Sequence, residues 1–151
     1  MRYQHKAFVR WDDLHAMGHV NNAKYLTFAQ EARFEWSFVQ PSQQNNRPGI
    51  LEMVVAHADV DFLAPIFEGG IYVDVELWVE SIGNSSFTMI YEITNKGALC
   101  ARVKTVQVAV DEALLNPAPS MTRNVHFCSN IWRSRRSEFC IGPAGNSSMV
   151  A

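Results

Sequence analysis

One long helical pattern followed by a series of strand patterns is the feature that most restricts the fold of this chain. From Ile50 to Asp111, apolar and polar residues alternate as they do in strands with one buried face. Residues typical of turns separate these segments, at Pro65, Gly69-Gly70, Gly83-Asn84 and Asn95-Lys96-Gly97. Because most of the connections are short, the sequence predicts an antiparallel sheet.

The alternation also predicts the faces of the strands. Apolar residues on one expected face are Val54, Ala56, Ala58, Val60 and Phe62, then Ile71, Val73, Val75, Leu77 and Val79, then Phe87, Met89, Tyr91 and Ile93. The face opposite Val54 is expected to hold Val55, His57, Asp59, Asp61 and Leu63. In the last run, Leu99 to Val110, the apolar phase changes between Val103 and Val106, which indicates either a bulge or a strand covered on both faces.

A single long helix is expected to start near Ala23. Its apolar residues recur at helical spacing, at Tyr25, Phe28, Ala29, Ala32, Trp36 and Val39. Asn21 or Asn22 is a suitable N-cap, and Pro41 is expected to end the helix. Leu26, Phe34 and Phe38 lie off the main stripe, so we expect this helix to be buried on more than one side.

These elements, with a first strand from about Gln4 to Trp11, predict an α+β fold in which an antiparallel sheet curls around a central helix. A chain of 151 residues fits one domain, which we place at residues 4–119. The tail, residues 120–151, shows no clear periodicity, and its structure stays uncertain. The polar segment Pro41–Gly49 is expected to be a loop without a catalytic role.

Composition excludes several classes of function. The formal net charge of -2 gives no electrostatic reason to expect a nucleic acid or membrane partner. The N-terminus lacks the apolar core of a signal peptide, and no stretch approaches the ~20 apolar residues of a membrane span. We therefore expect a cytoplasmic protein. Its 3 cysteines are odd in number and widely spaced, which argues for reduced thiols rather than disulfides or a zinc site.

The stretch from Val9 to Asn22 contains most of the residues suited to chemistry. It holds two acids, two histidines, a glycine and two asparagines between the first strand and the helix. The free backbone N–H groups at a helix start attract negative charge, so those of Asn21, Asn22 and Ala23 are candidates to bind an oxyanion. If the protein is an enzyme, we expect its site here.

This stretch resembles the signature of the hotdog-fold acyl-CoA thioesterases of the 4-hydroxybenzoyl-CoA thioesterase type. Their pattern is roughly aromatic-x-D-x-D-x-x-G-H-V-N-N-x-x-Y, ending in E-x-A-R. The matching residues here are Trp11, Asp13, Gly18-His19-Val20-Asn21-Asn22, Tyr25 and Glu31-Ala32-Arg33. The resemblance covers about Lys6 to Pro119. It implies a five- or six-stranded antiparallel sheet around one long helix, sites at a subunit interface, and a homodimer or homotetramer.

One departure from that signature affects the expected mechanism. Asp13 matches the first acid of the pattern, but His15 stands where the family carries the second acid, the one usually given the catalytic role. His15 is therefore a candidate general base for water, since imidazole has an unperturbed pKa near 6.5, with Asp13 polarising it. The alternatives are a loop histidine bonded to the backbone and a loop-capping carboxylate.

The remaining candidates have structural alternatives as well. Glu31 is the reserve base, or part of the interface or the substrate tunnel. For the substrate-binding residues we expect Gly18 to supply a backbone conformation, His19 to line the pocket or bond across the loop, and Tyr25 to belong to the core and the pocket. Asn21, Asn22 and Ala23 complete this group as caps or oxyanion donors. The five histidines lack metal-ligand spacing, so no metal or other cofactor is expected.

The sequence thus predicts an acyl-CoA thioesterase that hydrolyses a thioester to the free acid and CoA. The alternative from another class is a hotdog protein that binds an acyl thioester or a partner without turning it over. A hotdog dehydratase is a third reading, disfavoured because the usual dehydratase helix signature is not evident. Acyl-chain preference is not encoded in any pattern that we identify.

Overall fold

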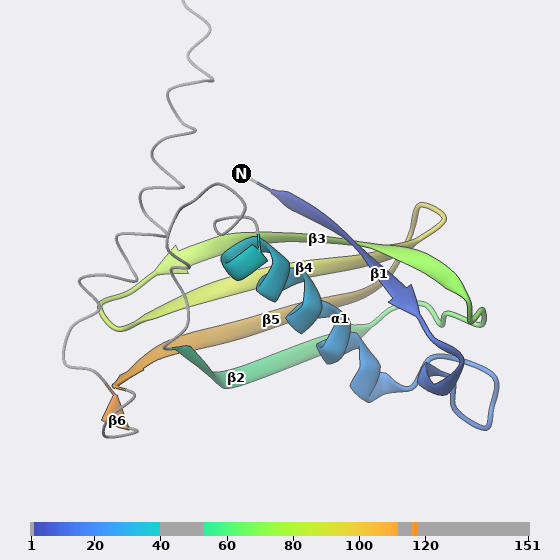
Figure 1. The fold of residues 1–151 in the computed structure, drawn as a ribbon, viewed down its shortest axis with the longest axis horizontal. Coiled ribbons are helices and arrows are strands. Elements are labelled where there is room, and N and C mark those ends of the chain that lie inside the picture. Colours follow the sequence, from blue (N-terminus) through green and yellow to red (C-terminus); the bar gives the residue numbers. More distant parts are fainter. Residues whose placement is uncertain (1, 40–52, 112–115, 118–151) are drawn as a thin grey trace, which may run out of the picture.

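The computed structural model describes residues 2–39, 53–111 and 116–117. Figure 1 shows the elements in chain order. They are β1 (Tyr3–Val9), the 3-10 turn η1 (Trp11–Asp13), α1 (Asn22–Phe34), the π-helical turn η2 (Glu35–Val39), β2 (Met53–Phe62), β3 (Ile71–Ile82), β4 (Ser86–Asn95), β5 (Ala98–Asp111) and β6 (Asn116–Pro117). Among these residues, no helix is long and apolar enough to cross a lipid bilayer.

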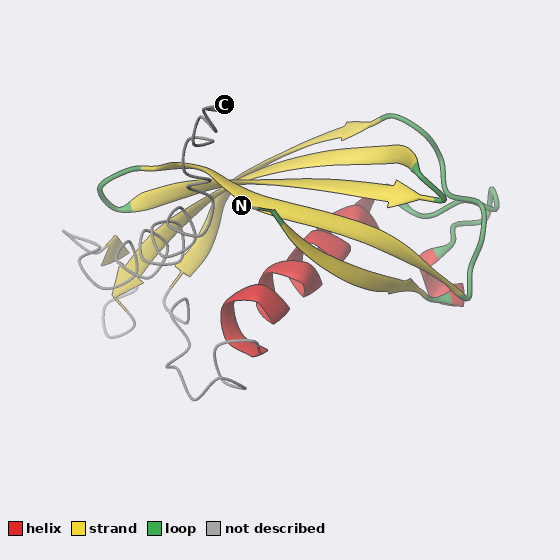
Figure 2. Cartoon of the chain, turned by 90° about the horizontal axis from the view of Figure 1, so that it is seen from above, coloured by secondary structure: helices red, strands yellow, loops and turns green. Residues whose placement is uncertain are grey.

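The strands form one antiparallel sheet in the order β1-β3-β4-β5-β2, and the two-residue β6 pairs with β5. Figure 2 shows α1 lying along one face of the curved sheet. This arrangement confirms the predicted α+β hotdog architecture, with one long helix against an antiparallel sheet. It also leaves β1 and β2 as the two edges of the main sheet path.

The core lies between α1 and the sheet. Tyr25, Phe28, Ala29 and Ala32 are the buried residues of the helix, which confirms the predicted stripe as far as Ala32. Trp36 and Val39, which were expected to continue it, lie in the π-helical turn η2 and are half-buried. On β4, Phe87, Met89, Tyr91 and Ile93 are all at most 1% exposed, as their alternation predicts. Burial of such large side chains stabilises each by about 1.5–3 kcal/mol relative to exposure, so this face fixes the helix on the sheet.

The first strand ends earlier than expected. β1 stops at Val9, and Trp11 begins the turn η1 instead of continuing the alternation of Ala7 and Val9. As a result the Trp11 side chain is 86% exposed. The cause is local, because the Arg10 N–H donates to the Asp13 carboxylate and the Asp13 N–H donates to the Arg10 carbonyl, which closes a tight turn.

A bulge in β2 corrects the predicted faces of that strand. Val55 pairs with Gln107 and His57 pairs with Val106, so Ala56 is an extra residue between them. Directly paired residues share a face, so Val55 lies on the helix side with the buried Gln107. Val54 pairs with Val108 and lies on the outer side, contrary to the prediction.

Neither predicted cause explains the apparent phase change in β5: the residues from Val103 to Val106 pair regularly with both neighbouring strands, and the outer face is exposed at Arg102 and Lys104. Ala101, Val103, Thr105 and Gln107 are all at most 3% exposed, so one face of β5 stays buried without interruption. The Gln107 side-chain amide donates to the Thr105 hydroxyl at 2.8 Å, which allows two polar residues to be buried there. The bulges lie elsewhere, at Ala56 of β2 and at Cys100 of β5.

The outward side of α1 is not covered by the described part of this chain. Leu26 is 39% exposed and Phe34 is 53% exposed, so the described residues do not provide the burial that was expected on a second side of the helix. Phe38 is half-buried and stacks on Phe34, with 4.9 Å between the ring centroids. The expected stop at Pro41, the loop that follows it and the tail after Ser120 lie outside the described residues.

Candidate active site at the start of the helix

The loop that precedes α1 is closed by its own backbone. The His15 N–H donates to the His19 carbonyl at 2.9 Å, and the Gly18 N–H donates to the His15 carbonyl at 2.8 Å. Gly18 has φ +77, a left-handed conformation that favours glycine, which agrees with the expected backbone role. The Val20 N–H donates to the Ile66 carbonyl at 2.8 Å and ties the loop to the segment after β2.

The helix start offers fewer free donors than the sequence suggested. Asn21 is the N-cap: its side-chain oxygen accepts the Ala23 N–H at 3.0 Å, and its own N–H donates to the Asp13 carbonyl at 2.9 Å. Two of the three expected oxyanion donors are therefore occupied. The Asn22 N–H has no hydrogen-bond partner among the described residues.

Asp13 is buried under the turn and does not contact His15. Its side chain is 1% exposed; one oxygen lies 2.8 Å from the Lys24 ammonium, and the other accepts the Arg10 N–H at 2.7 Å. Burial by itself raises the pKa of this carboxyl, but Lys24 and the Arg10 amide outweigh it, so the pKa of Asp13 lies below its ordinary value. The expected polarisation of His15 by Asp13 has no support in this geometry.

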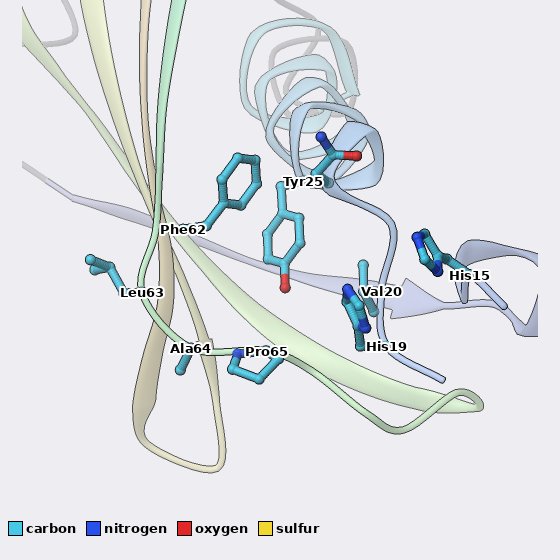
Figure 3. Close-up of a pocket in the computed structure, with 9 residues that line it drawn as sticks. His15, His19, Val20, Tyr25, Phe62, Leu63, Ala64 and Pro65 are labelled. Atoms are coloured by element: carbon cyan, nitrogen blue, oxygen red, sulfur yellow. The ribbon is translucent and has the colours of Figure 1, made fainter. Parts of the chain in front are cut away.

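A pocket of about 430 Å³ opens between the loop, the helix start and the end of β2. Its walls come from His15, His19, Val20, Asn22, Tyr25, Phe62, Leu63, Ala64 and Pro65. The rings of Tyr25 and Phe62 meet edge to face, 5.4 Å apart between centroids (Figure 3). Burial raises the pKa of the Tyr25 hydroxyl, which therefore stays protonated at neutral pH.

The two loop histidines face the same pocket but differ in their bonding. The Met17 N–H donates to His15 Nδ1 at 3.0 Å. In the neutral ring the proton then lies on Nε2, which makes His15 a donor at that atom. The His19 ring lies 5.0 Å from the His15 ring, between centroids, and neither of its nitrogens has a hydrogen-bond partner in the described part of the chain.

Glu31 lies elsewhere on the helix. Its carboxylate is 3.5 Å from the Arg10 guanidinium, and it is not one of the residues that line the pocket at the helix start. It lines instead a second hollow of about 490 Å³ with Thr27, Gln30, Arg33, Phe34, Ser37, Met53 and Gln107. Within one chain, the reserve base is therefore separate from the histidines.

The structure thus brings together four of the nine predicted site residues, namely His15, His19, Asn22 and Tyr25. Gly18, Asn21, Ala23 and Asp13 do not line this pocket, but their backbone conformation and hydrogen bonds hold the loop and the helix start. Sequence reasoning missed Phe62 as a wall and Lys24 as the partner of Asp13. The strand alternation placed Phe62 on the apolar face of its strand and so contained a signal for this residue. No pattern in the sequence contained a signal for Lys24. Within residues 2–39 and 53–111, no three His, Cys, Asp or Glu side chains are grouped to hold a metal ion.

Comparison with known proteins places this site in context. The chain is 31% identical over 114 residues to a 1,4-dihydroxy-2-naphthoyl-CoA hydrolase from Nostoc punctiforme, covering 74% of this chain and 76% of the relative. A DHNA-CoA thioesterase structure from Staphylococcus aureus superposes with a TM-score of 0.73 at 22% identity, covering 93% of this chain and 97% of that one.

A second similar structure is a thioesterase from Thermus thermophilus complexed with coenzyme A and Zn. It superposes with a TM-score of 0.64 at 26% identity, covering 84% of this chain and 93% of that one. The family model of the thioesterase-like superfamily matches residues 9–125, which include the loop, the helix and the sheet described above. This protein belongs to the thioesterase-like superfamily.

Proposed function

We propose that this protein hydrolyses acyl-CoA thioesters in the pocket at the start of α1. Family membership and the CoA-thioester hydrolase relative both support this reaction class. The observation that carries the site assignment concerns Asn22, the first helical residue, which lines the pocket together with the two histidines. Its N–H has no hydrogen-bond partner among the described residues. A helix-start donor of this kind stabilises the negative charge that develops on the thioester carbonyl oxygen.

In the proposed mechanism the carbonyl oxygen points to the Asn22 N–H. His15 Nε2–H is the second donor to this oxygen, because its Nδ1 is already engaged by Met17. His19 accepts a proton from a water molecule as that water attacks the carbonyl carbon. The C–S bond then breaks, and the proton from His19 passes to the CoA sulfur, which gives the free acid and CoA thiol.

This proposal changes the roles expected for two residues. His15 is kept in the reaction, but as a donor rather than as the base, since a base at Nδ1 would have to give up the Met17 N–H. Asp13 is removed from the chemistry, because both of its oxygens face groups of the scaffold. Glu31 remains a reserve base only if a second subunit completes the site.

We further propose that the preferred acyl group is a flat aromatic ring. The pocket volume of about 430 Å³ is within the range of small-ligand sites. Tyr25 and Phe62 form an edge-to-face pair at its wall, which suits the insertion of a further ring. The hydrolase from Nostoc punctiforme, whose substrate is a naphthoyl-CoA by name, supports the same choice.

A homodimer joined through β2 and the outward side of α1 completes the proposal. β2 is an edge strand whose outer backbone groups are unpaired within the described residues, and such edges readily pair with a second chain. Val55 is 44% exposed on its helix side, and Leu26 and Phe34 are exposed on the helix itself. Phe62, the last residue of β2, is 53% exposed and lines the pocket, so a second copy that pairs with this strand would cover that wall.

Release of free thiol from a panel of acyl-CoAs tests the function. The panel contains acetyl-CoA, hexanoyl-CoA, palmitoyl-CoA, benzoyl-CoA and 1,4-dihydroxy-2-naphthoyl-CoA. We expect turnover, with the largest kcat/KM for an aromatic member. A folded protein that binds these thioesters without releasing thiol would refute the enzyme proposal in favour of a binding protein, and a preference for palmitoyl-CoA would refute the aromatic pocket.

A further inference from the structure

The contact between Lys24 and Asp13 joins the turn after β1 to the first turn of α1, on either side of the loop that carries His15 and His19. Asp13 closes the turn after β1, Lys24 lies in the first turn of α1, and their charged groups are 2.8 Å apart. Asp13 is 1% exposed while the Lys24 side chain is 31% exposed, so the lysine reaches inward to a carboxylate that solvent does not reach. A buried carboxylate needs such a partner, because its desolvation is otherwise unfavourable.

Asp13 also engages its surroundings through its backbone. Its carbonyl accepts the Asn21 N–H at 2.9 Å, while its second side-chain oxygen accepts the Arg10 N–H at 2.7 Å. The same residue therefore contacts the end of β1, the N-cap and, through Lys24, the helix. The loop with His15 and His19 begins at Leu14, directly after Asp13, and ends at Asn21, which is bonded to Asp13. Leu14 also bridges Val20, so the two ends of the loop are held together beside Asp13.

We propose that Lys24 is a positioning residue for thioester hydrolysis, acting through Asp13 to hold the Asn22 N–H and the two loop histidines in reacting geometry. This inference rests on the proposed function. Lys24 is not among the residues that line the pocket, so it acts on the substrate only through the scaffold. Loss of the contact lets the turn and the helix start shift relative to each other, and shifts of about 1 Å reduce turnover about 100-fold in well-studied cases.

The chain offers a matched control for this contact. Lys6 and Asp74 form an ion pair of similar length, 3.0 Å, between β1 and β3, but both side chains are more than half exposed and neither residue lines the pocket. Exposed pairs of this kind contribute about 0–1 kcal/mol. Lys6→Met therefore removes the same charge without removing a partner from a buried group.

Steady-state kinetics of Lys24→Met, Lys24→Arg and Lys6→Met test the proposal. We expect Lys24→Met to lower kcat at least about tenfold with a small change in KM. Lys24→Arg should retain most of the natural kcat, and Lys6→Met should have the same kcat as the natural sequence. In Lys24→Met the acid limb of the kcat profile should move to higher pH, because burial then raises the pKa of Asp13 without an opposing cation. A kcat unchanged in Lys24→Met would overturn the proposal.

Two further measurements separate positioning from folding and from the function itself. In an Asp13→Asn background, Lys24→Met should lower kcat little further, because each substitution breaks the same contact. An equal loss of kcat on adding Lys24→Met to the natural sequence and to Asp13→Asn would contradict the proposal. Backbone amide NMR reports the geometry without turnover: Lys24→Met should move the Asn21 and Asn22 signals and Lys6→Met should not. If no acyl-CoA is hydrolysed by the natural sequence, the function fails while this NMR result still decides whether Lys24 holds the helix start.

Discussion

The Asn21 side-chain oxygen accepts the backbone N–H of Ala23 at 3.0 Å, so the helix cap and the candidate oxyanion site draw on the same small group of donors. The Asn21 N–H is also engaged, by the Asp13 carbonyl. Of the N–H groups of Asn21, Asn22 and Ala23, this leaves that of Asn22, a residue that lines the pocket, without a partner among the described residues.

Replacement of the cap should cost stability. Asn21→Ala removes the acceptor for Ala23, and loss of an N-cap side chain typically costs about 1 kcal/mol of unfolding free energy. Urea denaturation followed by circular dichroism measures this change. Asn21→Asp, which retains a capping oxygen, is the control and should stay close to the natural stability; equal destabilisation by both substitutions would contradict the capping role.

The two loop histidines should have separable effects on turnover. His19→Ala should lower kcat about 100-fold or more if His19 is the base, and added imidazole should recover part of the loss. His15→Ala removes a proposed oxyanion donor, a change that costs about 2.7–4 kcal/mol of transition-state stabilisation in known cases, and imidazole should not recover it. His57→Ala, on the exposed outer side of β2, is the control. If imidazole restored turnover in His15→Ala but not in His19→Ala, the two roles would be reversed.

Phe62 should determine the preference for aromatic acyl groups. Phe62 is 53% exposed, and its ring lies against Tyr25 at the pocket wall. Phe62→Ala therefore removes one of the two rings and with it the aromatic pair. We expect kcat/KM for benzoyl-CoA to fall about tenfold relative to hexanoyl-CoA, since pocket contacts of this size are worth about 1–3 kcal/mol. Val54→Ala, on the outer side of the same strand, should change neither value. An equal fall for both substrates would show that Phe62 only supports the fold.

Acid should selectively remove the contribution of Asp13 to stability. Because the pKa of Asp13 is lowered on folding, its charge stabilises the fold fully above the unfolded value of about 3.9 and loses this effect as pH falls toward the folded value. Asp13→Asn should therefore cost roughly 1–3 kcal/mol at pH 7 and progressively less below pH about 4. Denaturation curves at several pH values measure both proteins, and a cost that is independent of pH would refute the assignment.

The outward side of α1 should control the oligomeric state. Phe34→Glu places a charge on a side chain that is 53% exposed in one chain and that we assign to the dimer interface. Sedimentation velocity should then show a shift from dimer to monomer. Phe8→Glu is the control, because Phe8 is 40% exposed but lies on the other face of the sheet, next to the buried Ala7 and Val9. A natural chain that sediments as a monomer would refute the dimer directly.

Periodicity predicted the elements whose surroundings are regular. The buried face of β4 and the helix stripe from Tyr25 to Ala32 follow from repeats of two and 3.6 residues, since each has one continuous apolar neighbour. Trp11 departs from the strand because a turn formed by Asp13 overrides the alternation. No periodic signal records such a bond between backbone and side chain.

The site was harder to predict than the fold for a related reason. The motif located the loop and the helix start correctly, and His15, His19, Asn22 and Tyr25 do share a pocket. Which N–H groups remain free depends on bonds such as that from Asn21 to the carbonyl of Asp13, eight positions away. Asp13 is paired in turn with Lys24, which lies eleven positions away and carries no motif. A sequence lists these donors and acceptors without pairing them.

The bulge at Ala56 also has a consequence for how the length of this strand can vary. Val55 and His57 already face opposite sides, because they pair with consecutive residues of β5, Gln107 and Val106. Deletion of Ala56 would therefore leave every other side chain of β2 on its present face and restore a regular ladder. Homologous chains that are one residue shorter here should be aligned with a gap at Ala56, and they would retain the same pocket wall at Phe62.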